Sequence, residues 1–224
     1  VIIYAGSLVN PQLLEYAKKD CEIHNSAYMT LEQLIDVIKS AEHEGKMTVR
    51  LHTGDPSLYG AIREQMDRLD ELGIKYDICP GVSSFCGAAA ALRAEYTLPD
   101  VSQTVIITRM AGRTPVPEKE SIAALAAHNA TMVIFLSTGL LKELSAELIR
   151  GGYKPDTPAA IVYKASWADQ KVCRCTVEDL AQTASDNGIT KTALICVGYF
   201  LGNDYSLSKL YDKSFETEFR KAEI

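Results

Sequence analysis

The sequence predicts an α/β fold of parallel strands and helices, arranged in two halves. Short apolar runs alternate with longer amphipathic runs along the whole chain, which is the pattern of repeated strand–helix units. With 224 residues and 47% hydrophobic content, the chain can bury a substantial core. A polar stretch with two prolines, residues 109–118 (RMAGRTPVPE), predicts a linker between domains. We therefore expect α/β domains over residues 1–108 and 119–224.

Boundary signals define the elements of the first half. Thr30 and Gln33 have the spacing of a capping box at the start of a helix, and Gly45 ends that helix. Gly73 marks the end of the next helix. The turn 80–84 (PGVSS) leads into an alanine-rich helix. The expected strands are 1–5, 47–52, 75–79 and 104–108, and the expected helices are 11–18, 31–44, 57–72 and 84–92.

The second half continues the alternation. Gly151 and Gly152 close one helix, and Thr176 is expected to cap another. No internal repeat and no low-complexity segment interrupts the pattern. The expected helices are 120–128, 140–150 and 177–185, and the expected strands are 131–136, 159–163, 171–175 and 192–197.

Composition argues against several classes of protein. Lys and Arg number 23 against 29 Asp and Glu, a net charge of -6, whereas a nucleic-acid binder usually shows an excess or a block of basic residues. No run approaches the roughly 18 apolar residues of a membrane-spanning helix, and no signal-peptide pattern is present. We expect a cytoplasmic protein that contacts neither nucleic acid nor membrane.

The cysteines and histidines form no metal-binding pattern. The sequence has no CxxC pair, and its four histidines are scattered. We interpret the thiols as small core residues of a reduced protein and expect no metal site. The cysteines are Cys21, Cys79, Cys86, Cys173, Cys175 and Cys196.

The segment 47–60 (MTVRLHTGDPSLYG) carries the strongest functional signal. An apolar strand pattern runs into Gly54-Asp55-Pro56 and then into a helix-like run. Parallel α/β proteins place small-molecule sites at such turns, outside the carboxyl end of a strand. Glycine lets a ligand approach the backbone, and the aspartate can accept hydrogen bonds from a ribose or an amine. The alternative is an Asp-Pro turn that only connects two elements.

Several motifs, taken in order, resemble one family. They are HTGDPSLYG (52–60), PGVSS (80–84), TRMAGRTPVPE (108–118), VIFLS (133–137), VYKASW (162–167) and SKLYD (208–212). Over essentially the whole chain they resemble the tetrapyrrole methylases of cobalamin biosynthesis. The resemblance implies two α/β domains, a homodimer, and S-adenosylmethionine (S-adenosyl-L-methionine) held in a cleft between the domains. Within the family, the segments 113–118 (RTPVPE) and 208–212 look most like those of members that methylate C11 of precorrin-4 or cobalt-precorrin-4, and the resemblance implies this activity.

The chain also departs from the family pattern at its start. It opens inside a strand pattern, and no GxGxxG occurs anywhere. Family members begin with a strand and a loop of GxGPGD type. We therefore expect that about 30 residues, a first βα unit with the glycine-rich loop, are missing from the first domain.

The resemblance also implies which residues bind the cofactor. They are Thr53, Gly54, Asp55, Leu58, Ser83, Ser84, Leu136, Tyr163 and Ala165. Three of these assignments have structural alternatives: Ser83-Ser84 could cap the following helix, Leu136 could be a core strand residue, and Tyr163 could be a packing aromatic. The resemblance names no catalytic residue.

Arg109 and Arg113 are the candidates for substrate binding. A substrate with many acetate and propionate groups needs local positive charge, and Arg grips carboxylates with two parallel hydrogen bonds. Surface ion pairs would explain either arginine as well. Methyl transfer needs alignment and exclusion of water more than a nucleophile, so the lack of a Ser/His/Asp pattern is consistent with it.

Two alternative functions stay open at this point. One is a sister tetrapyrrole methylase that acts at another ring position or on another substrate. The other is a non-catalytic corrinoid- or nucleotide-binding module, which only the missing glycine-rich loop favours.

Overall fold

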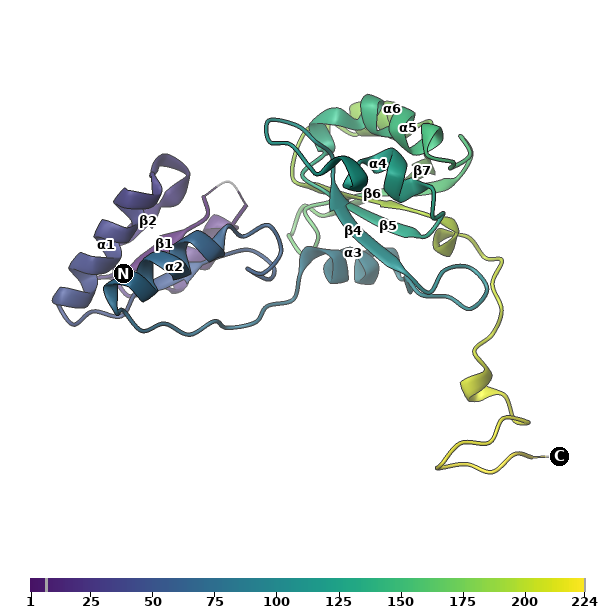
Figure 1. The fold of residues 1–224 in the computed structure, drawn as a ribbon, viewed down its shortest axis with the longest axis horizontal. Helices are drawn as coiled ribbons and strands as arrows, with labels where there is room; N and C mark the ends of the chain where they lie inside the picture. The colour runs from purple at the N-terminus through teal and green to yellow at the C-terminus, as the bar shows by residue number, and fades with distance from the viewer. Residues whose placement is uncertain (7, 224) are drawn as a thin grey trace. The chain divides into compact units, whose positions relative to one another are not determined.

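The computed structural model describes residues 1–6 and 8–223 and divides into two compact units, Val1–Cys86 and Gly87–Ile224. Each unit has its own sheet with helices packed on it (Figure 1). The predicted α/β class is confirmed.

The first unit is a three-stranded parallel sheet with two long helices. Its strands β1 (Ile2–Tyr4), β2 (Ile23–Asn25) and β3 (Val49–Leu51) lie in the order β2-β1-β3. Its core joins Ile3 of β1 to Leu34, Ile35 and Ile38 of α1 (Leu31–His43) and Leu69 of α2 (Ile62–Leu72). Fully burying such an aliphatic side chain contributes about 1.5–3 kcal/mol.

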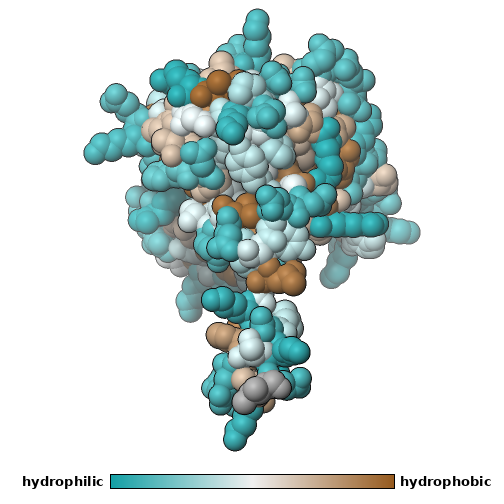
Figure 2. Space-filling model, turned by 90° about the vertical axis from the view of Figure 1, so that its right-hand side faces the viewer, coloured by the Kyte–Doolittle hydropathy of each residue, from teal (hydrophilic) through white to brown (hydrophobic). Residues whose placement is uncertain are grey.

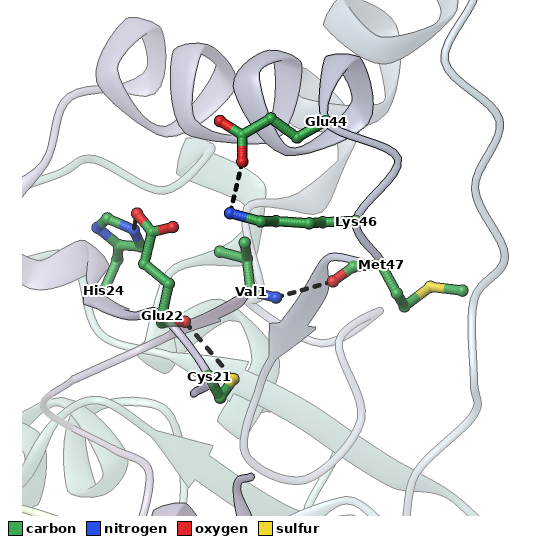
Figure 3. A network of polar contacts seen from close by, with 7 residues as sticks. All are labelled: Val1, Cys21, Glu22, His24, Glu44, Lys46 and Met47. Carbon is green, nitrogen blue, oxygen red and sulfur yellow. Dashed lines mark hydrogen bonds and ion pairs between the residues drawn. The ribbon is translucent and has the colours of Figure 1, made fainter. Parts of the chain in front are cut away.

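Polar contacts fix the start of this sheet. The Val1 amino group donates to the Met47 carbonyl oxygen (2.8 Å), and the Ile2 N–H donates to the Glu22 carbonyl oxygen (2.8 Å). Lys46 pairs with Glu44 (2.5 Å) across the turn after α1 (Figure 3). These bonds hold the chain segments that enter β2 and β3 beside the first residues of β1.

A half-buried arginine links the strands to α2. The guanidinium of Arg50, in β3, donates to the Ile3 carbonyl oxygen (3.0 Å), Ser26 Oγ (3.0 Å) and Gln65 Oε1 (3.2 Å). Burial lowers the pKa of Arg50, and burial followed by the charge of Arg50 lowers the pKa of His52. All three acceptors of Arg50 are neutral protein groups, so this arginine has a structural role.

The second unit is built on a five-stranded mixed sheet in the order β4-β5-β8-β6-β7. β4 and β5 are parallel, whereas β8 is antiparallel to both β5 and β6, and β7 is antiparallel to β6. Its strands are β4 (Val105–Arg109), β5 (Thr131–Phe135), β6 (Pro158–Tyr163), β7 (Lys171–Thr176) and β8 (Ala193–Val197).

Helices cover both faces of this sheet. α4 (Ile122–Ala126), α5 (Leu141–Arg150) and α6 (Leu180–Asp186) pack on one face, over a core that includes Met132, Ile134 and Ile161 (Figure 1). Cys173 and Cys175 of β7 point toward that core. Arg174, between them, donates to the Leu92 carbonyl oxygen (3.0 Å) at the end of α3 (Ser84–Leu92), so α3 lies on the opposite face.

The position of β4 corrects the expected domain boundary. The strand expected at 104–108 was placed in the first half, but β4 pairs with β5 along its whole length and belongs to the second unit. Residues 109–118 are therefore a connection between β4 and α4 inside one unit, and the expectation of an interdomain linker was wrong. Proline and polar residues mark an exposed connection equally well in both settings.

Several elements differ locally from the expectations. The segment expected as a strand at 75–79 belongs to no ladder among the described residues, and the sequence does not predict the short β2. The helix expected at 11–18 is a 3₁₀ helix (Pro11–Tyr16). Thr176, expected as the cap of the last helix, instead ends β7 and donates to Asp179 Oδ2 (2.7 Å). Asp179 is the N-cap residue of α6 and makes no side-chain capping bond.

The face shown in Figure 2 is mainly hydrophilic, with small separate hydrophobic patches. Within the described residues, every helix is too short or too polar to cross a lipid bilayer.

Candidate functional site

The turn after β3 is organised by the carboxylate of Asp55. Asp55 Oδ1 accepts hydrogen bonds from the Ser57 N–H (2.9 Å) and the Ser57 hydroxyl, and Oδ2 accepts one from the Gly81 N–H (2.8 Å). These donors, with the Ser57 hydroxyl as the largest contribution, lower the pKa of the Asp55 carboxyl. The carboxylate thus joins two turns that are 26 residues apart in sequence.

The two turns touch through their backbones. A Cβ atom on Gly81 would lie 2.1 Å from the Gly54 carbonyl oxygen, and one on Gly54 would lie 3.3 Å from Ser83 Cα and from the Ser84 nitrogen. Gly54 also has a φ of +62°. Glycine at both positions lets the turns close on one another. The sequence-predicted residues Gly54, Asp55, Ser83 and Ser84 are therefore neighbours in the first unit.

The segment between this turn and α2 is not helical. Tyr59 (φ 57°) and Ala61 (φ 49°) adopt left-handed conformations, and a Cβ atom on Gly60 would lie 2.1 Å from the Pro56 carbonyl oxygen. These residues delay the start of α2 to Ile62, five residues after the expected start. Thr53 is exposed and Leu58 is partly buried in this loop.

In the second unit, topology brings three strand ends to one edge of the sheet. β4 and β5 are parallel, and β6 has the same direction because both β5 and β6 are antiparallel to β8. The carboxyl ends of these strands therefore share an edge. Arg109, Leu136 and Tyr163 lie at or directly after these three ends.

A buried serine joins two of these ends. The Ser137 hydroxyl donates to the Phe135 carbonyl oxygen (2.7 Å) and accepts from the Met110 N–H (2.9 Å). Leu136, between them, is 59% exposed with a φ of +52°. The predicted Leu136 is thus no core residue: its backbone conformation turns it out of the strand.

The third end is also strained. Lys164 (φ 45°) and Ser166 (φ 73°) flank Ala165, and all three follow Tyr163 directly. A Cβ atom on Gly87 would lie 3.5 Å from Ala165 Cβ, so Ala165 packs beside α3. Backbone strain of this kind gathers at ligand sites, where the surrounding contacts maintain it.

The two candidate substrate arginines have different environments. The Arg109 guanidinium donates to the carbonyl oxygens of Met110 (3.1 Å), Thr114 (3.2 Å) and Pro115 (2.7 Å), so it shapes its own loop. Arg113 is exposed within that loop. Of the two, Arg113 has the guanidinium available to a bound carboxylate.

Sequence reasoning missed several residues that hold these turns. Ser57 and Gly81 bind the Asp55 carboxylate, and Ser137 joins two strand ends. An Asp-Pro-Ser run is a signal for the first, because Asp side chains accept hydrogen bonds from the residue two positions on. No local signal predicts the Ser137 bond, whose donor is 27 residues away in sequence.

The thiol prediction holds only in part. Cys196 is buried, and burial raises its pKa to about 12, but Cys79 and Cys86 are exposed. All six cysteines are free. Among the described residues, no group of three or more His, Cys, Asp or Glu side chains could hold a metal ion.

A cavity of about 1400 Å³ lies along β3 in the first unit. β3, α2 and residues 73–79 provide most of its lining, and it extends to Gly54 and Pro56 of the turn. Residues of β3 and of the segment 75–79 both line this cavity.

Both units thus carry exposed, glycine-bearing or strained turns at the carboxyl ends of parallel strands, the position that ligand sites take in proteins of the open α/β class. A profile of the tetrapyrrole (corrin/porphyrin) methylases matches residues 1–181. The cobalt-precorrin-4 C(11)-methyltransferase of Methanocaldococcus jannaschii is 58% identical over 223 residues, which cover 99% of this chain and 86% of that protein. The chain belongs to the tetrapyrrole methylase family.

Solved structures agree with this assignment. The X-ray structure of a cobalt precorrin-4 methyltransferase of cobalamin biosynthesis matches with a TM-score of 0.87 and 47% identity, covering 90% of this chain and 84% of that chain. Uroporphyrin-III C-methyltransferase from Thermus thermophilus, complexed with S-adenosylhomocysteine, matches with a TM-score of 0.69 and 20% identity, covering 89% and 81% of the two chains. The second likeness shows a shared fold.

Proposed function

We propose that this chain is an S-adenosylmethionine-dependent methyltransferase that adds a methyl group to C11 of precorrin-4 or cobalt-precorrin-4. The observation that carries the proposal is the 58% identity over 223 residues to a cobalt-precorrin-4 C(11)-methyltransferase. That match spans the motifs of both units, including the loop 109–118 and the segment 208–212.

The cofactor-binding residues are proposed in two groups. Thr53, Gly54, Asp55, Leu58, Ser83 and Ser84 form the first, in the paired turns of the first unit. Leu136, Tyr163 and Ala165 form the second, at the sheet edge of the second unit. Gly54 supports this assignment, because a Cβ atom there would lie 3.3 Å from Ser83 Cα, so glycine lets the two turns that carry these residues pack together. Asp55 acts chiefly by holding the paired turns, since three protein donors occupy its carboxylate.

The reaction requires little covalent chemistry from the protein. S-adenosylmethionine would supply an electrophilic methyl group on its sulfonium. An electron pair of the ring carbon would form the new carbon–carbon bond in line as the methyl–sulfur bond breaks, and S-adenosylhomocysteine would leave as the neutral thioether. The residues at the strand ends have to align donor and acceptor and exclude water, and alignment alone can contribute roughly 7–11 kcal/mol. Arg113 is the proposed contact for an acidic substituent of the macrocycle, because its guanidinium can bind a carboxylate with two parallel bonds.

One experiment tests the reaction directly. The protein is incubated with methyl-labelled S-adenosylmethionine and either precorrin-4 or cobalt-precorrin-4, and the labelled carbon is located by NMR. We expect label at C11 with at least one of the two substrates. Label at another carbon would identify a sister methylase, and binding without transfer would leave a corrinoid-binding module.

We further propose a homodimer and a cytoplasmic location, as the family resemblance implies. Size-exclusion chromatography with light scattering measures the first, and a mass of one chain across the micromolar range would contradict it. Fractionation of the source cells measures the second.

A further inference from the structure

Lys164 sits in a cluster of aromatic and acidic side chains at the end of β6. Its ammonium lies 5.1 Å from the centre of the Tyr163 ring and 4.9 Å from that of the Trp167 ring. It also pairs with Asp169 Oδ2 at 2.6 Å, and its side chain is 22% exposed. Asp169 is the largest of the groups that raise the pKa of Lys164. The lysine is therefore charged at neutral pH and held on three sides.

The backbone beneath this cluster is bent twice. Lys164 and Ser166 have φ values of 45° and 73°, so two non-glycine residues in three adopt left-handed conformations. Hydrogen bonds close the turn from the Lys164 N–H to the Thr192 carbonyl oxygen (3.0 Å), from the Trp167 N–H to the Lys164 carbonyl oxygen (3.0 Å), and from the Ser166 N–H to Gln170 Oε1 (2.7 Å). Such conformations persist only where surrounding contacts determine them.

The side chains that contact the Lys164 ammonium come from both sides of Ala165 in the sequence. Tyr163 and Lys164 precede Ala165, and Trp167 and Asp169 follow it, so contacts of the Lys164 ammonium join the two ends of the turn. Left-handed residues are common in hairpin connections. Here they stand on both sides of Ala165, so their conformations set the direction of the Ala165 main chain.

We propose that Lys164 is a positioning residue for cofactor binding: its contacts with Tyr163, Trp167 and Asp169 form a clamp that holds the Ala165 main chain in the conformation that the proposed S-adenosylmethionine site uses. The proposal rests on the proposed function. The rival explanation is that the clamp only stabilises the β6–β7 hairpin, in which case its loss would change stability and leave ligand affinity unchanged.

Trp167 is the only tryptophan of the chain, so its fluorescence reports on this turn alone. The test compares wild type with Lys164→Met, which keeps the side-chain length but removes the charge, and with Lys164→Arg, which keeps the charge over the rings. Lys142→Met, on the exposed face of α5, is the matched control for loss of one positive charge. Titration calorimetry with S-adenosylhomocysteine gives Kd, steady-state kinetics gives the KM for the tetrapyrrole, and thermal melting gives stability.

We expect Lys164→Met to raise the Kd for S-adenosylhomocysteine roughly five- to tenfold and to shift the Trp167 emission, with the tetrapyrrole KM within twofold of wild type. Lys164→Arg should recover most of the affinity, and Lys142→Met should match wild type. If Lys164→Met does not fold, Asp169→Asn, which removes only the ion pair, takes its place with a smaller rise in Kd.

Two outcomes would overturn the proposal in distinguishable ways. If wild type binds S-adenosylhomocysteine and Lys164→Met binds it within twofold, the clamp does not position the cofactor and only this inference fails. If wild type does not bind S-adenosylhomocysteine, both the proposed function and the inference about Lys164 are wrong.

Discussion

The carboxylate of Asp55 holds together two turns of the proposed cofactor site. Both of its oxygens bind protein donors, and the Gly81 N–H ties the turn after β3 to the turn before α3. An Asp at a strand-to-helix turn indicates a functional site, but the sequence does not distinguish an Asp that contacts the ligand from one that holds the surrounding backbone in place. The hydrogen bonds of Asp55 to Ser57 and Gly81 favour the second role.

We expect Asp55→Asn to weaken S-adenosylhomocysteine binding roughly tenfold, because the neutral amide loses charge-assisted bonds to the two turns. Since the pKa of the Asp55 carboxyl is lowered in the folded protein, its stabilising contribution is complete above the unfolded value and is lost as the pH falls through the folded value. Binding calorimetry at pH 7 measures the effect. An unchanged Kd would leave Asp55 with only a connecting role.

The proposed contact between Arg113 and the substrate can be tested by steady-state kinetics. Arg113→Glu should raise the tetrapyrrole KM at least tenfold while leaving the Kd for S-adenosylhomocysteine within twofold, because the exposed guanidinium is proposed to meet a substrate carboxylate. Lys142→Glu, on the exposed face of α5, is the control for reversing one exposed charge. A KM that changes equally in both variants would show a general charge effect.

At the scale of elements, the helices with complete local signals formed as predicted. α1 has the capping box in full: the Gln33 N–H donates to Thr30 Oγ1 (3.3 Å) and the Thr30 N–H donates to Gln33 Oε1 (2.9 Å). α5 and α3 also agree with their expected ranges to within one residue. α2 begins five residues later than expected, because Tyr59 and Ala61 adopt left-handed backbone conformations. No sequence pattern predicts that conformation for a tyrosine or an alanine.

Thr30→Ala should lower the free energy of unfolding by about 1 kcal/mol, the usual contribution of an N-cap side chain. Urea denaturation followed by circular dichroism measures it. Thr114→Ala, in the exposed loop after β4, is the control and should leave stability within about 0.5 kcal/mol of wild type. A loss in Thr30→Ala no larger than in the control would contradict the role of the cap.

Gly81→Ala tests the contact between the two turns. The added Cβ would lie 2.1 Å from the Gly54 carbonyl oxygen, and one backbone has to move for it to fit. We expect a destabilisation of about 1–3 kcal/mol together with a loss of S-adenosylhomocysteine affinity. Gly139→Ala is the matched control, because nothing lies within 4 Å of its added Cβ. Equal stability of the two variants would show that the turns are not packed as described.

At the scale of the whole molecule, the two units have separate cores. The large core cluster from Ile122 to Val197 lies entirely in the second unit, and the smaller cluster around Ile3 lies entirely in the first. All strands of each sheet also belong to a single unit. Folding of the second unit therefore depends on contacts that it contains itself.

A fragment of residues 84–224, which keeps α3 intact, should fold alone. We expect it to show α/β circular dichroism and a single cooperative thermal transition, because it retains the whole core cluster of the second unit. The control is the full chain, whose melting should contain this transition. A fragment without cooperative melting would show that the first unit is needed for the second to fold.

The sequence alone determined the α/β class, most helix positions, and the family, because these depend on periodicity, capping residues and motifs that are local along the chain. Tertiary structure alone decided where β4 belongs, that residues 75–79 stay out of the ladder, and that Leu136 turns outward. It also decided that Asp55 reaches Gly81 and that Ser137 reaches Met110. These outcomes depend on partners 26 and 27 residues apart in sequence, or on which strand offers a free edge, and neither is encoded in a local pattern.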